Sequence, residues 1–562
     1  MGGAVFRAAI IGAGVSFVLA AFVLLAAAAA SSADDARADP VPGSSLRFDA
    51  SGSDGGVIPT HFVGLSIEWS LIERYMGPNA RPAFAKLLRN LGSGELRIGG
   101  SSQDLMPFDA SAPNTNRVIT PEDLLAIRAA LDAANVPAYD GADKRRHLPG
   151  WATILGTAMA PPNQERPWVS PRHARAFVTE GVLPAFADGG QREIVGIGLG
   201  NEPDISYDGD LARYLTDLAT YRDADVTGPL AIVAPSTSEQ IAPWQAFEAR
   251  SVNTRFFWDW PAILDVIAPA MRARRGPFGA LATDHFYPVA RGCATNDYRC
   301  ATIERLLSDE RFANLDHLVY THAAQAAQRG LAYRLQETNT AAGRGVPGVS
   351  DVAASATWAL EAMFEAACPQ PPNAPTANAG CHTGAIGINL HNAEVNEFFV
   401  PEQGNAYYNP ILYDPSPSAG SPSAAPTYYA LLLFARFAQG TRGLRPVALS
   451  AHSTANAQPK AWRVEADGQR RLFLINTAAD PQTVAVTAPQ SRYELDRMTP
   501  YDPTGAGRTL DAPQVLIDGR AVAADGSWPG FASVTGRIGR GELQITLGAG
   551  EAAVVSVPDP AR

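Results

Sequence analysis

The feature that most constrains this sequence is an alternation, repeated eight times, of short apolar segments with longer amphipathic ones. The apolar segments have the length of buried strands and lie at 62–68, 95–99, 151–158, 193–199, 230–235, 281–286, 331–336 and 385–390. The segments 121–134, 211–224, 351–366 and 426–439 have helical spacing. Strands that alternate with helices in this way predict a parallel (β/α)8 barrel, the TIM barrel of the α/β class.

The helix predicted at 121–134 also carries a signal for where it begins. Thr120 has a side chain suited to an N-cap, and Pro121 suits the first helical position. Glu122 and Asp123 follow, where a negative charge complements the positive end of the helix. We therefore expect this helix to begin at Pro121.

Beyond residue 441 the pattern changes to strands without long helices. The segments 461–465 and 471–476 flank Asp467-Gly468, a dipeptide that tolerates the positive φ of a tight hairpin turn. The segments 543–547 and 552–557 flank two glycines and predict a second hairpin. We therefore expect a barrel over 57–440 and a C-terminal β-sandwich over 441–562. An early strand near 45–50 should join the sandwich, because a closed barrel has no edge to accept it.

The N-terminal segment 1–33 has the organisation of a targeting signal. Arg7 precedes an almost uncharged stretch from Ala8 to Ala30, and small residues then lead into an acidic region. This order predicts a secretory signal peptide that is cleaved near Ala30 or Ala33. The stretch from 8 to 30 has 23 positions, enough to span a bilayer, so an uncleaved anchor is the alternative. Either way, we expect the folded part to be secreted or extracytoplasmic.

The four cysteines fit an exported protein. An even number of cysteines in an exported chain favours disulfides over free thiols. Four cysteines allow three pairings, and we favour the neighbours in sequence, Cys293 with Cys300 and Cys368 with Cys381, because each pair lies within one predicted loop. No spacing of cysteines and histidines suggests a tetrahedral metal site, so we expect no metal.

Charge restricts the partners of the chain. The formal net charge is -11 and the pI is near 5.4, so we expect no nucleic acid partner and no membrane contact apart from an N-terminal anchor. We interpret the basic run Lys144-Arg145-Arg146-His147 as a solvated loop, with a local basic pocket as the alternative. The glycines form no phosphate-binding pattern, and we expect no cofactor.

Two predicted strands end at glutamates. The strand at 193–199 leads into Asn201-Glu202-Pro203, and the strand at 331–336 leads into Glu337. The carboxyl ends of parallel barrel strands meet at one face, where barrel enzymes hold their catalytic groups. Cleavage of a glycosidic bond requires a protonated carboxylic acid and a carboxylate that face each other in this way. Taken alone, Asn-Glu-Pro also fits a turn that starts a helix, with the asparagine as its cap.

Several motifs together resemble glycoside hydrolase family 79, which includes β-glucuronidases and heparanase. The motifs are GLSIE at 64–68, LRIGGS at 96–101, GNEPD at 200–204, ETN at 337–339 and GVSD at 348–351. Many barrel glycosidases share Asn-Glu-Pro, whereas the stretch from Glu337 to Asp351 is more specific. The resemblance runs from about Phe48 to the C-terminus, and it implies a barrel followed by a β-sandwich.

The resemblance also implies roles for the two glutamates and their neighbours. Glu202 would be the acid/base and Glu337 the nucleophile of a retaining hydrolysis. Asn201 would donate to the 2-hydroxyl of the sugar. Tyr287 would orient the Glu337 carboxylate. His285 would lie alongside, unless it is a satisfied structural histidine.

Ser101 matches a sugar-contacting position of the family, although the two glycines that precede it also fit a simple sharp turn. The chain departs from the family where glucuronidases carry a tyrosine followed by glycines, whose hydroxyl and amides hold the uronic carboxylate. Ala342 stands at the position of that tyrosine. Our hypothesis is that Arg344 binds the carboxylate instead, because a guanidinium matches a carboxylate bidentately. The alternative is a modified or neutral sugar.

Together with the two glutamates, the resemblance implies an exported, retaining β-glycosidase that removes terminal β-glucuronic acid or 4-O-methylglucuronic acid from glycans or glycosides. Three alternatives stay open at this point. The first is an endo-acting enzyme of the heparanase type, and the second is a β-glycosidase for a neutral sugar. The third is a non-catalytic carbohydrate-binding protein, which the presence of both carboxylates disfavours.

Overall fold

The computed structural model describes most of the chain between residues 44 and 558. The described ranges are 44–47, 55–135, 150–161, 166–238, 258–292, 299–371, 380–395, 404–415, 421–449, 459–466, 468–487, 492–505, 507–538 and 542–558. The predicted targeting segment 1–33 and the basic run 144–147 lie outside these ranges. Within them, no helix combines the length and the apolar character needed to cross a membrane.

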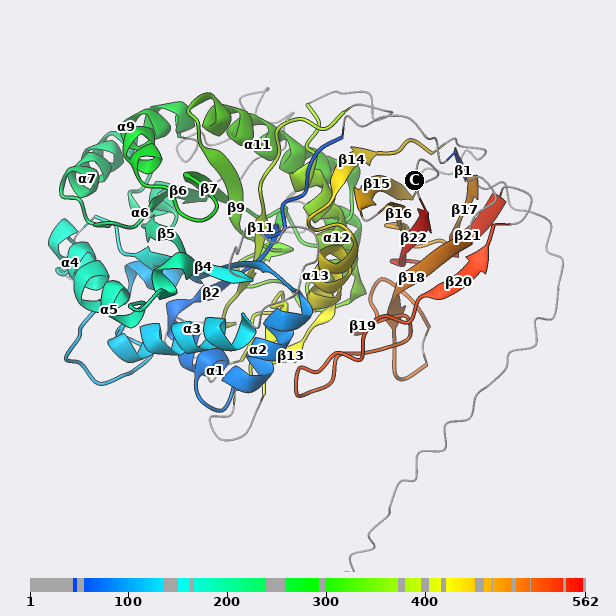
Figure 1. Cartoon of the computed structure of the whole chain (residues 1–562), viewed down its shortest axis with the longest axis horizontal. Helices are drawn as coiled ribbons and strands as arrows, with labels where there is room; N and C mark the ends of the chain where they lie inside the picture. The colour runs from blue at the N-terminus through cyan, green and yellow to red at the C-terminus, as the bar shows by residue number, and fades with distance from the viewer. Residues whose placement is uncertain are drawn as a thin grey trace, which may run out of the picture. The chain divides into compact units, whose positions relative to one another are not determined.

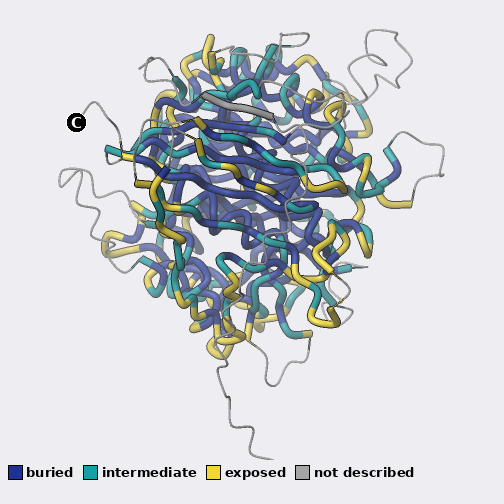
Figure 2. The backbone as a smooth tube through the Cα atoms, turned by 90° about the vertical axis from the view of Figure 1, so that its right-hand side faces the viewer, coloured by how far each residue is buried: buried dark blue, intermediate teal, exposed yellow. Residues whose placement is uncertain are grey.

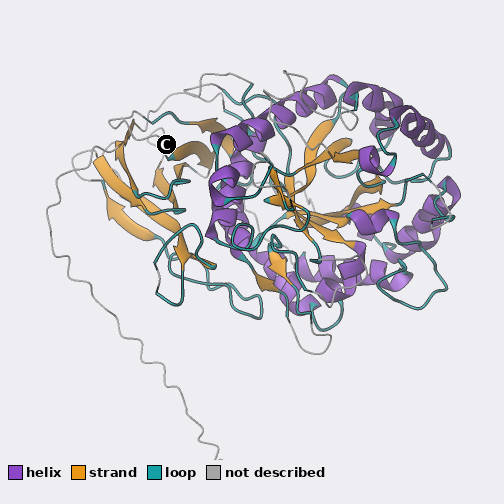
Figure 3. Cartoon of the chain, turned by 180° about the vertical axis from the view of Figure 1, so that it is seen from behind, coloured by secondary structure: helices purple, strands orange, loops and turns teal. Residues whose placement is uncertain are grey.

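Eight parallel strands close into a barrel, and the predicted (β/α)8 fold is confirmed (Figures 1 and 3). Around the barrel the order is β11, β2, β3, β4, β5, β6, β7 and β9. The strands are β2 (Val63–Glu68), β3 (Gly94–Gly99), β4 (Trp151–Thr157), β5 (Ile194–Leu199), β6 (Ile232–Ser238), β7 (Leu281–Phe286), β9 (Ala332–Thr338) and β11 (Ile388–Asn392). Each corresponds to one of the eight apolar segments. Helices cover the outer face of each strand and the barrel interior buries the inner face, so apolar residues occur along the whole length of the strands.

Helices surround the barrel strands, as Figure 3 shows. They are α1 (Ile72–Met76), α2 (Arg81–Asn90), α3 (Pro121–Ala134), α4 (Pro171–Ala176), α5 (Leu183–Ala185), α6 (Pro203–Ser206), α7 (Leu211–Asp223), α9 (Trp260–Ala273), α10 (Ile303–Leu306), α11 (Asp309–Gln328), α12 (Ala353–Ala367) and α13 (Pro426–Phe437). The start of α3 is as expected: Thr120 and Asp123 form a reciprocal capping box, and Pro121 opens the helix. Two short strand pairs lie outside the barrel, β8 (Val289–Ala290) with β10 (Ala341–Ala342), and β12 (Ile411–Leu412) with β13 (Ser423–Ala424).

The interior of the barrel contains a buried ion pair beneath the strand ends. Arg334 on β9 lies 2.7 Å from Glu95 on β3, and neither side chain is exposed. Arg334 also donates to the Asn389 side chain and to backbone carbonyls at His61 and Phe62. Glycines leave the space that the guanidinium needs: a Cβ at 387 would lie 1.9 Å from Arg334 Nη1, and one at 64 would lie 2.4 Å from Nη2. The pair fixes β9, which carries Glu337, against β3 and β11.

We predict that Arg334→Met lowers the free energy of unfolding by about 3–5 kcal/mol, because it leaves the Glu95 carboxylate buried without its cation. Urea denaturation would measure the loss. Arg334→Met combined with Glu95→Gln is the matched control, and it should recover much of the lost stability because it removes the unpaired charge. Equal instability of the single and the double variant would contradict this account.

The C-terminal part forms two β-sheets. The larger sheet has the order β14 (Arg442–Pro446), β15 (Lys460–Ala466), β16 (Gln469–Ile475), β22 (Ala552–Pro558), β18 (Arg492–Tyr501) and β19 (Gln514–Ile517), and β20 (Val534–Arg537) also pairs with β18. The smaller sheet consists of β1 (Ser44–Arg47), β17 (Gln482–Thr487) and β21 (Glu542–Leu547). Side chains of both sheets share one apolar core, which includes Leu472, Val484, Ile545 and Val555. Buried residues fill the middle of the molecule, as Figure 2 shows.

The two predicted hairpins have different outcomes. β15 and β16 pair in antiparallel register around Gly468, which has a φ of 72°. The prediction of a second hairpin was wrong. β21 pairs with β17, whereas β22 pairs with β16 and β18. The chain crosses from one sheet to the other between Leu547 and Ala552, since the apolar residues of both strands pack into the core between the sheets. The early strand β1 lies parallel to β17 in the smaller sheet.

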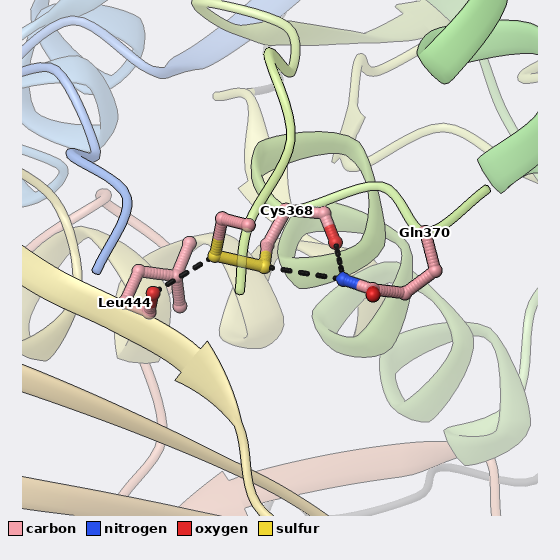
Figure 4. The surroundings of a disulfide bond; sticks show 4 residues. Cys368, Gln370 and Leu444 are labelled. Atoms are coloured by element: carbon pink, nitrogen blue, oxygen red, sulfur yellow. Dashed lines mark hydrogen bonds between the residues drawn. A yellow bond between two sulfur atoms is a disulfide. The ribbon is translucent and has the colours of Figure 1, made fainter. Parts of the chain in front are cut away.

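Helices α12 and α13 pack against the C-terminal sheets as well as the barrel. Phe364 on α12 stacks on Trp462 of β15 with ring centroids 5.0 Å apart, and Thr357 donates to the Gly550 carbonyl. The predicted disulfide Cys368–Cys381 is present and ties the end of α12 to a segment beside Leu444 (Figure 4). Cys300 is disulfide-bonded, but Cys293 lies outside the described residues, so its pairing stays a prediction.

Candidate active site

The carboxyl ends of the barrel strands bring the two predicted glutamates together. Glu202 follows β5, the fourth barrel strand, and Glu337 lies in β9, the seventh. One carboxylate oxygen of each lies within 4.8 Å of the other. Both line a cavity of about 250 Å³, together with Ser101, Ser238, His285, Phe286, Tyr287, Ala342, Gly343, Arg344 and Tyr408. Glu202 has a φ of 46°, a strained conformation of the kind that functional sites retain.

Glu337 is held as a carboxylate by the groups around it. The Tyr287 hydroxyl donates to Oε1 at 2.9 Å, and the Arg97 guanidinium donates to Oε2. The ring nitrogens of His391 and His285 lie 3.8 and 3.9 Å from Oε2. Burial alone would raise the pKa of Glu337, but these four neighbours outweigh it and hold the pKa well below its usual range. The predicted contact between Tyr287 and Glu337 is therefore present.

Glu202 has the opposite electrostatic environment. Its burial and the nearby charge of Glu337 raise the pKa of Glu202 to about 8, although about 21% of its side chain is exposed to the cavity. His285 Nδ1 lies 3.1 Å from Glu202 Oε1, and burial lowers the pKa of His285 to about 4, so the ring is neutral. His285 Nε2 has no hydrogen-bond partner among the described residues, so only Nδ1 of this ring has a protein partner there.

These opposite shifts predict a bell-shaped pH profile of kcat/KM if the pair performs acid and base chemistry. Glu337 must be ionised, and its lowered pKa places that limb on the acid side. Glu202 must be protonated, and its raised pKa places the alkaline limb near pH 8. Initial rates on an aryl glycoside between pH 3 and pH 9 would measure both limbs. Activity that already falls with rising pH near the usual pKa of a glutamate would contradict the assignment.

Asn201 is held by hydrogen bonds to Arg97 and Asp104. Arg97 Nη2 donates to Asn201 Oδ1 at 2.7 Å, and the Asn201 backbone amide donates to Asp104 Oδ2 at 3.1 Å. Because Arg97 occupies the side-chain oxygen, Nδ2 is the group that Asn201 can offer to a ligand. Nδ2 is a hydrogen-bond donor, which fits the predicted hydrogen bond from Asn201 to a sugar hydroxyl.

Ser101 and Arg344 are both held by one buried carboxylate. Glu68, which ends β2, accepts from the backbone amides of Ser101 and Ser102 at 3.2 and 2.8 Å. Arg344 Nη1 lies 3.3 Å from the same carboxylate. Gly100, with a φ of 71°, makes the sharp turn before Ser101. Ser101 itself lines the cavity, so both interpretations of this stretch apply. Arg344 has a φ of 76°, which is a strained conformation for a residue with a side chain.

Sequence reasoning assigned no role to four residues that complete the site: Arg97, His391, Glu68 and Tyr408. Glu68 had the same signal as the two catalytic candidates, a carboxylate at the end of a predicted strand. Arg97 had a weaker signal, a charge within a predicted buried strand. Tyr408 follows β11 in a region without a strand or helix pattern, so nothing in the sequence placed it near the barrel mouth.

Glu202, His285 and Glu337 also offer three possible metal ligands within 4.8 Å of one another. Arg97 already donates to Glu337, so a metal ion there would lie against a guanidinium. The cationic neighbour makes this group poorly suited to a resident cation.

No protein-family model matches the sequence, and no curated protein matches it. Solved structures nevertheless share its fold over most of its length. A 4-O-α-L-rhamnosyl-β-D-glucuronidase from Fusarium oxysporum 12S has 17% identity and a TM-score of 0.62, and the match covers 91% of this chain and 100% of that one. A family 51 α-L-arabinofuranosidase from Bifidobacterium longum has 14% identity, coverage of 92% and 100%, and a TM-score of 0.54. A monomeric β-xylosidase from Caulobacter crescentus CB15 has 12% identity, the same coverage, and a TM-score of 0.52. The chain therefore has the fold of TIM-barrel glycoside hydrolases.

Proposed function

We propose that the chain is an exported, retaining β-glycosidase that hydrolyses terminal β-glucuronic acid or 4-O-methylglucuronic acid residues, and that it is related to glycoside hydrolase family 79. The observation that carries the proposal is the pair Glu202 and Glu337, with oxygens within 4.8 Å and opposite pKa shifts. Retaining glycosidases separate their carboxyl groups by about 5–5.5 Å, whereas inverting ones leave about 6.5–9.5 Å for a water. The spacing supports direct attack by a carboxylate.

In the first step, Glu337 attacks the anomeric carbon while Glu202 gives its proton to the glycosidic oxygen. The bond to the leaving group breaks, and a covalent glycosyl ester forms on Glu337. Tyr287 and Arg97 hold the two oxygens of Glu337, so the carboxylate has one orientation when the sugar arrives. Once Glu337 loses its charge in the ester, the repulsion that raised the pKa of Glu202 disappears, so this pKa falls and Glu202 stays ionised, the form that a general base needs.

In the second step, Glu202 removes a proton from water, which attacks the anomeric carbon and releases Glu337. The His285 ring beside Glu202 Oε1 is neutral, so it can hold that carboxyl group in both protonation states without competing for the proton. The sugar leaves with the configuration that it had in the substrate.

Arg344 supports the choice of a uronic acid. Its side chain lines the cavity and is 15% exposed, and its Nη1 pairs with Glu68. A guanidinium has five N–H donors, so it can serve Glu68 and a substrate carboxylate at the same time. The loop that carries it is fixed: the Ala342 carbonyl accepts from the Arg291 amide, and the Arg344 carbonyl accepts from the Tyr407 amide.

We predict that Arg344→Ala raises KM for an aryl β-glucuronide about 10–100-fold, because a charged hydrogen bond contributes roughly 1.5–3 kcal/mol. KM for the matching β-glucoside should change far less, since this sugar has no carboxylate. Steady-state kinetics on both substrates would measure the ratio. Arg344→Lys is the matched control, which keeps the charge and loses the bidentate geometry. An unchanged preference for glucuronide over glucoside in Arg344→Ala would rule out this role.

The proposal as a whole is tested with a set of aryl β-glycosides: glucuronide, 4-O-methylglucuronide, glucoside, galactoside and xyloside. Turnover of the glucuronide above the others supports the proposed substrate. Turnover of a neutral glycoside alone would keep the mechanism and change the sugar, and Ala342 would then account for the difference. No turnover of any of them would favour an endo-acting enzyme or a binding protein.

A further inference from the structure

A second buried carboxyl group, that of Glu394, interacts electrostatically with Arg344. Glu394 follows β11, the barrel strand between β9 and β2, and its side chain is fully buried. Its Oε1 accepts a hydrogen bond from the Ser70 hydroxyl at 3.1 Å. Its Oε2 is buried and has no hydrogen-bond partner in the described parts of the chain. An ionised carboxylate with an unpaired buried oxygen is unfavourable, so this geometry suits a carboxyl group that carries a proton.

The described groups that face Glu394 come from three other elements. Glu68 at the end of β2 contributes a negative charge, and Arg344 after β10 contributes a positive one. Tyr75 on α1 is uncharged at neutral pH and donates its own proton to the Ile411 carbonyl. Burial and the charge of Glu68 raise the pKa of Glu394 to about 7, against the opposing effect of Arg344. Glu394 therefore changes its charge near neutral pH.

We propose that Glu394 is a proton-controlled specificity residue: when protonated it leaves Arg344 paired with Glu68 and able to attract a substrate carboxylate, and when ionised it weakens that attraction. The inference rests on the proposed function, because it concerns how a uronic acid is held. With Glu394 neutral, the set of Arg344, Glu68 and Glu394 has no net charge. With Glu394 ionised, the set has a charge of about -1 and repels an incoming carboxylate.

The substrate does not titrate in this range, since the pKa of a sugar acid lies near that of an α-carboxyl group, about 3.5. A change in uronate binding between pH 6 and pH 8 must therefore come from the protein. Glu202 also titrates in this range, but it acts on every glycoside alike. The ratio of kcat/KM for an aryl glucuronide to that for the matching glucoside cancels the contribution of Glu202 and isolates that of the subsite.

The test measures this ratio from pH 5.5 to pH 8.5 in the wild type and in Glu394→Gln, which keeps the bond from Ser70 and cannot ionise. We expect the wild-type ratio to fall about tenfold with rising pH, through KM of the glucuronide. The ratio in Glu394→Gln should stay at its acid-side value. A pH-independent wild-type ratio, or the same fall in the variant, would overturn the inference. A glucuronide that is not preferred at any pH would instead overturn the proposed function.

A measurement on the wild type tests the same inference if Glu394→Gln does not fold. Calorimetric titration with glucuronic acid near pH 7.5, in buffers of different ionisation enthalpy, reports protons taken up on binding. Binding that favours protonated Glu394 should take up a fraction of a proton, and glucose should take up less. Equal proton uptake for the two sugars would contradict the inference.

Discussion

Replacing Glu337 with alanine is expected to reduce kcat for an aryl β-glycoside about 10⁴-fold or more, because the variant lacks the carboxylate that we propose as the nucleophile. The Arg97 guanidinium and the Tyr287 hydroxyl would remain, with no carboxylate to hold. Both would still favour a negative charge at the same place. A small anion such as azide or formate should therefore enter the vacated space and restore part of the activity.

Glu337→Gln is the matched control for size, since it fills the space and gives no room to an added anion. It should be as inactive as Glu337→Ala and should not respond to azide. The anomeric configuration of an azide product distinguishes the two roles, because attack by azide from the position of the nucleophile gives the inverted sugar. Turnover by Glu337→Ala at the wild-type rate would show that another residue is the nucleophile.

Replacing Glu202 with alanine is expected to lower kcat about 10²–10⁴-fold, the usual contribution of a general acid and base. The loss should depend on the leaving group. A nitrophenolate leaves without a proton, so its glycoside should retain the first step, whereas a methyl glycoside should lose both steps. The alkaline limb near pH 8 should also disappear, because it reports the loss of the Glu202 proton.

Glu202→Gln serves as the matched control, with nearly the same shape and no acid function. Azide should accelerate Glu202→Ala as well, but here the product should keep the original configuration, because azide attacks the glycosyl ester on Glu337. If the losses were equal for good and poor leaving groups, Glu202 would have no acid role.

The barrel fold could be predicted from the sequence because each of its strands is buried on both faces. Such strands appear as nearly continuous apolar runs, and segments such as 193–199 stand out against the amphipathic helices around them. The prediction of a second hairpin failed because the pattern of a strand does not reveal which strand it pairs with. β21 and β22 are short strands separated by glycines, and sequence spacing alone does not distinguish a hairpin within one sheet from a crossing between two. The apolar core that the two sheets share determines that β21 and β22 lie in different sheets.

The site was predictable where its residues follow strand ends and unpredictable where loops supply them. Glu202 and Glu337 could be placed because strands of one barrel end at one face. Tyr408 joins them from the loop after β11, where the sequence has no recognisable motif. His391 lies in β11, directly after the segment predicted at 385–390, but it belongs to no recognisable motif and was given no role. Arg344 was chosen because it lies in the stretch where the family carries a tyrosine followed by glycines, and because a guanidinium matches a carboxylate. Its partner Glu68 lies at the opposite end of the barrel sequence, and closure of the barrel between β11 and β2 brings it close.

If Glu202 and Glu337 hydrolyse a β-glucuronide through a covalent intermediate, the sugar must first be released as its β-anomer. The most direct measurement is proton NMR of an aryl β-glucuronide during hydrolysis by the wild-type enzyme, which identifies the anomer released before mutarotation. We expect β-glucuronic acid to appear first and the α-anomer only later. First release of the α-anomer would contradict the nucleophilic role of Glu337, and absence of hydrolysis would contradict the proposed substrate.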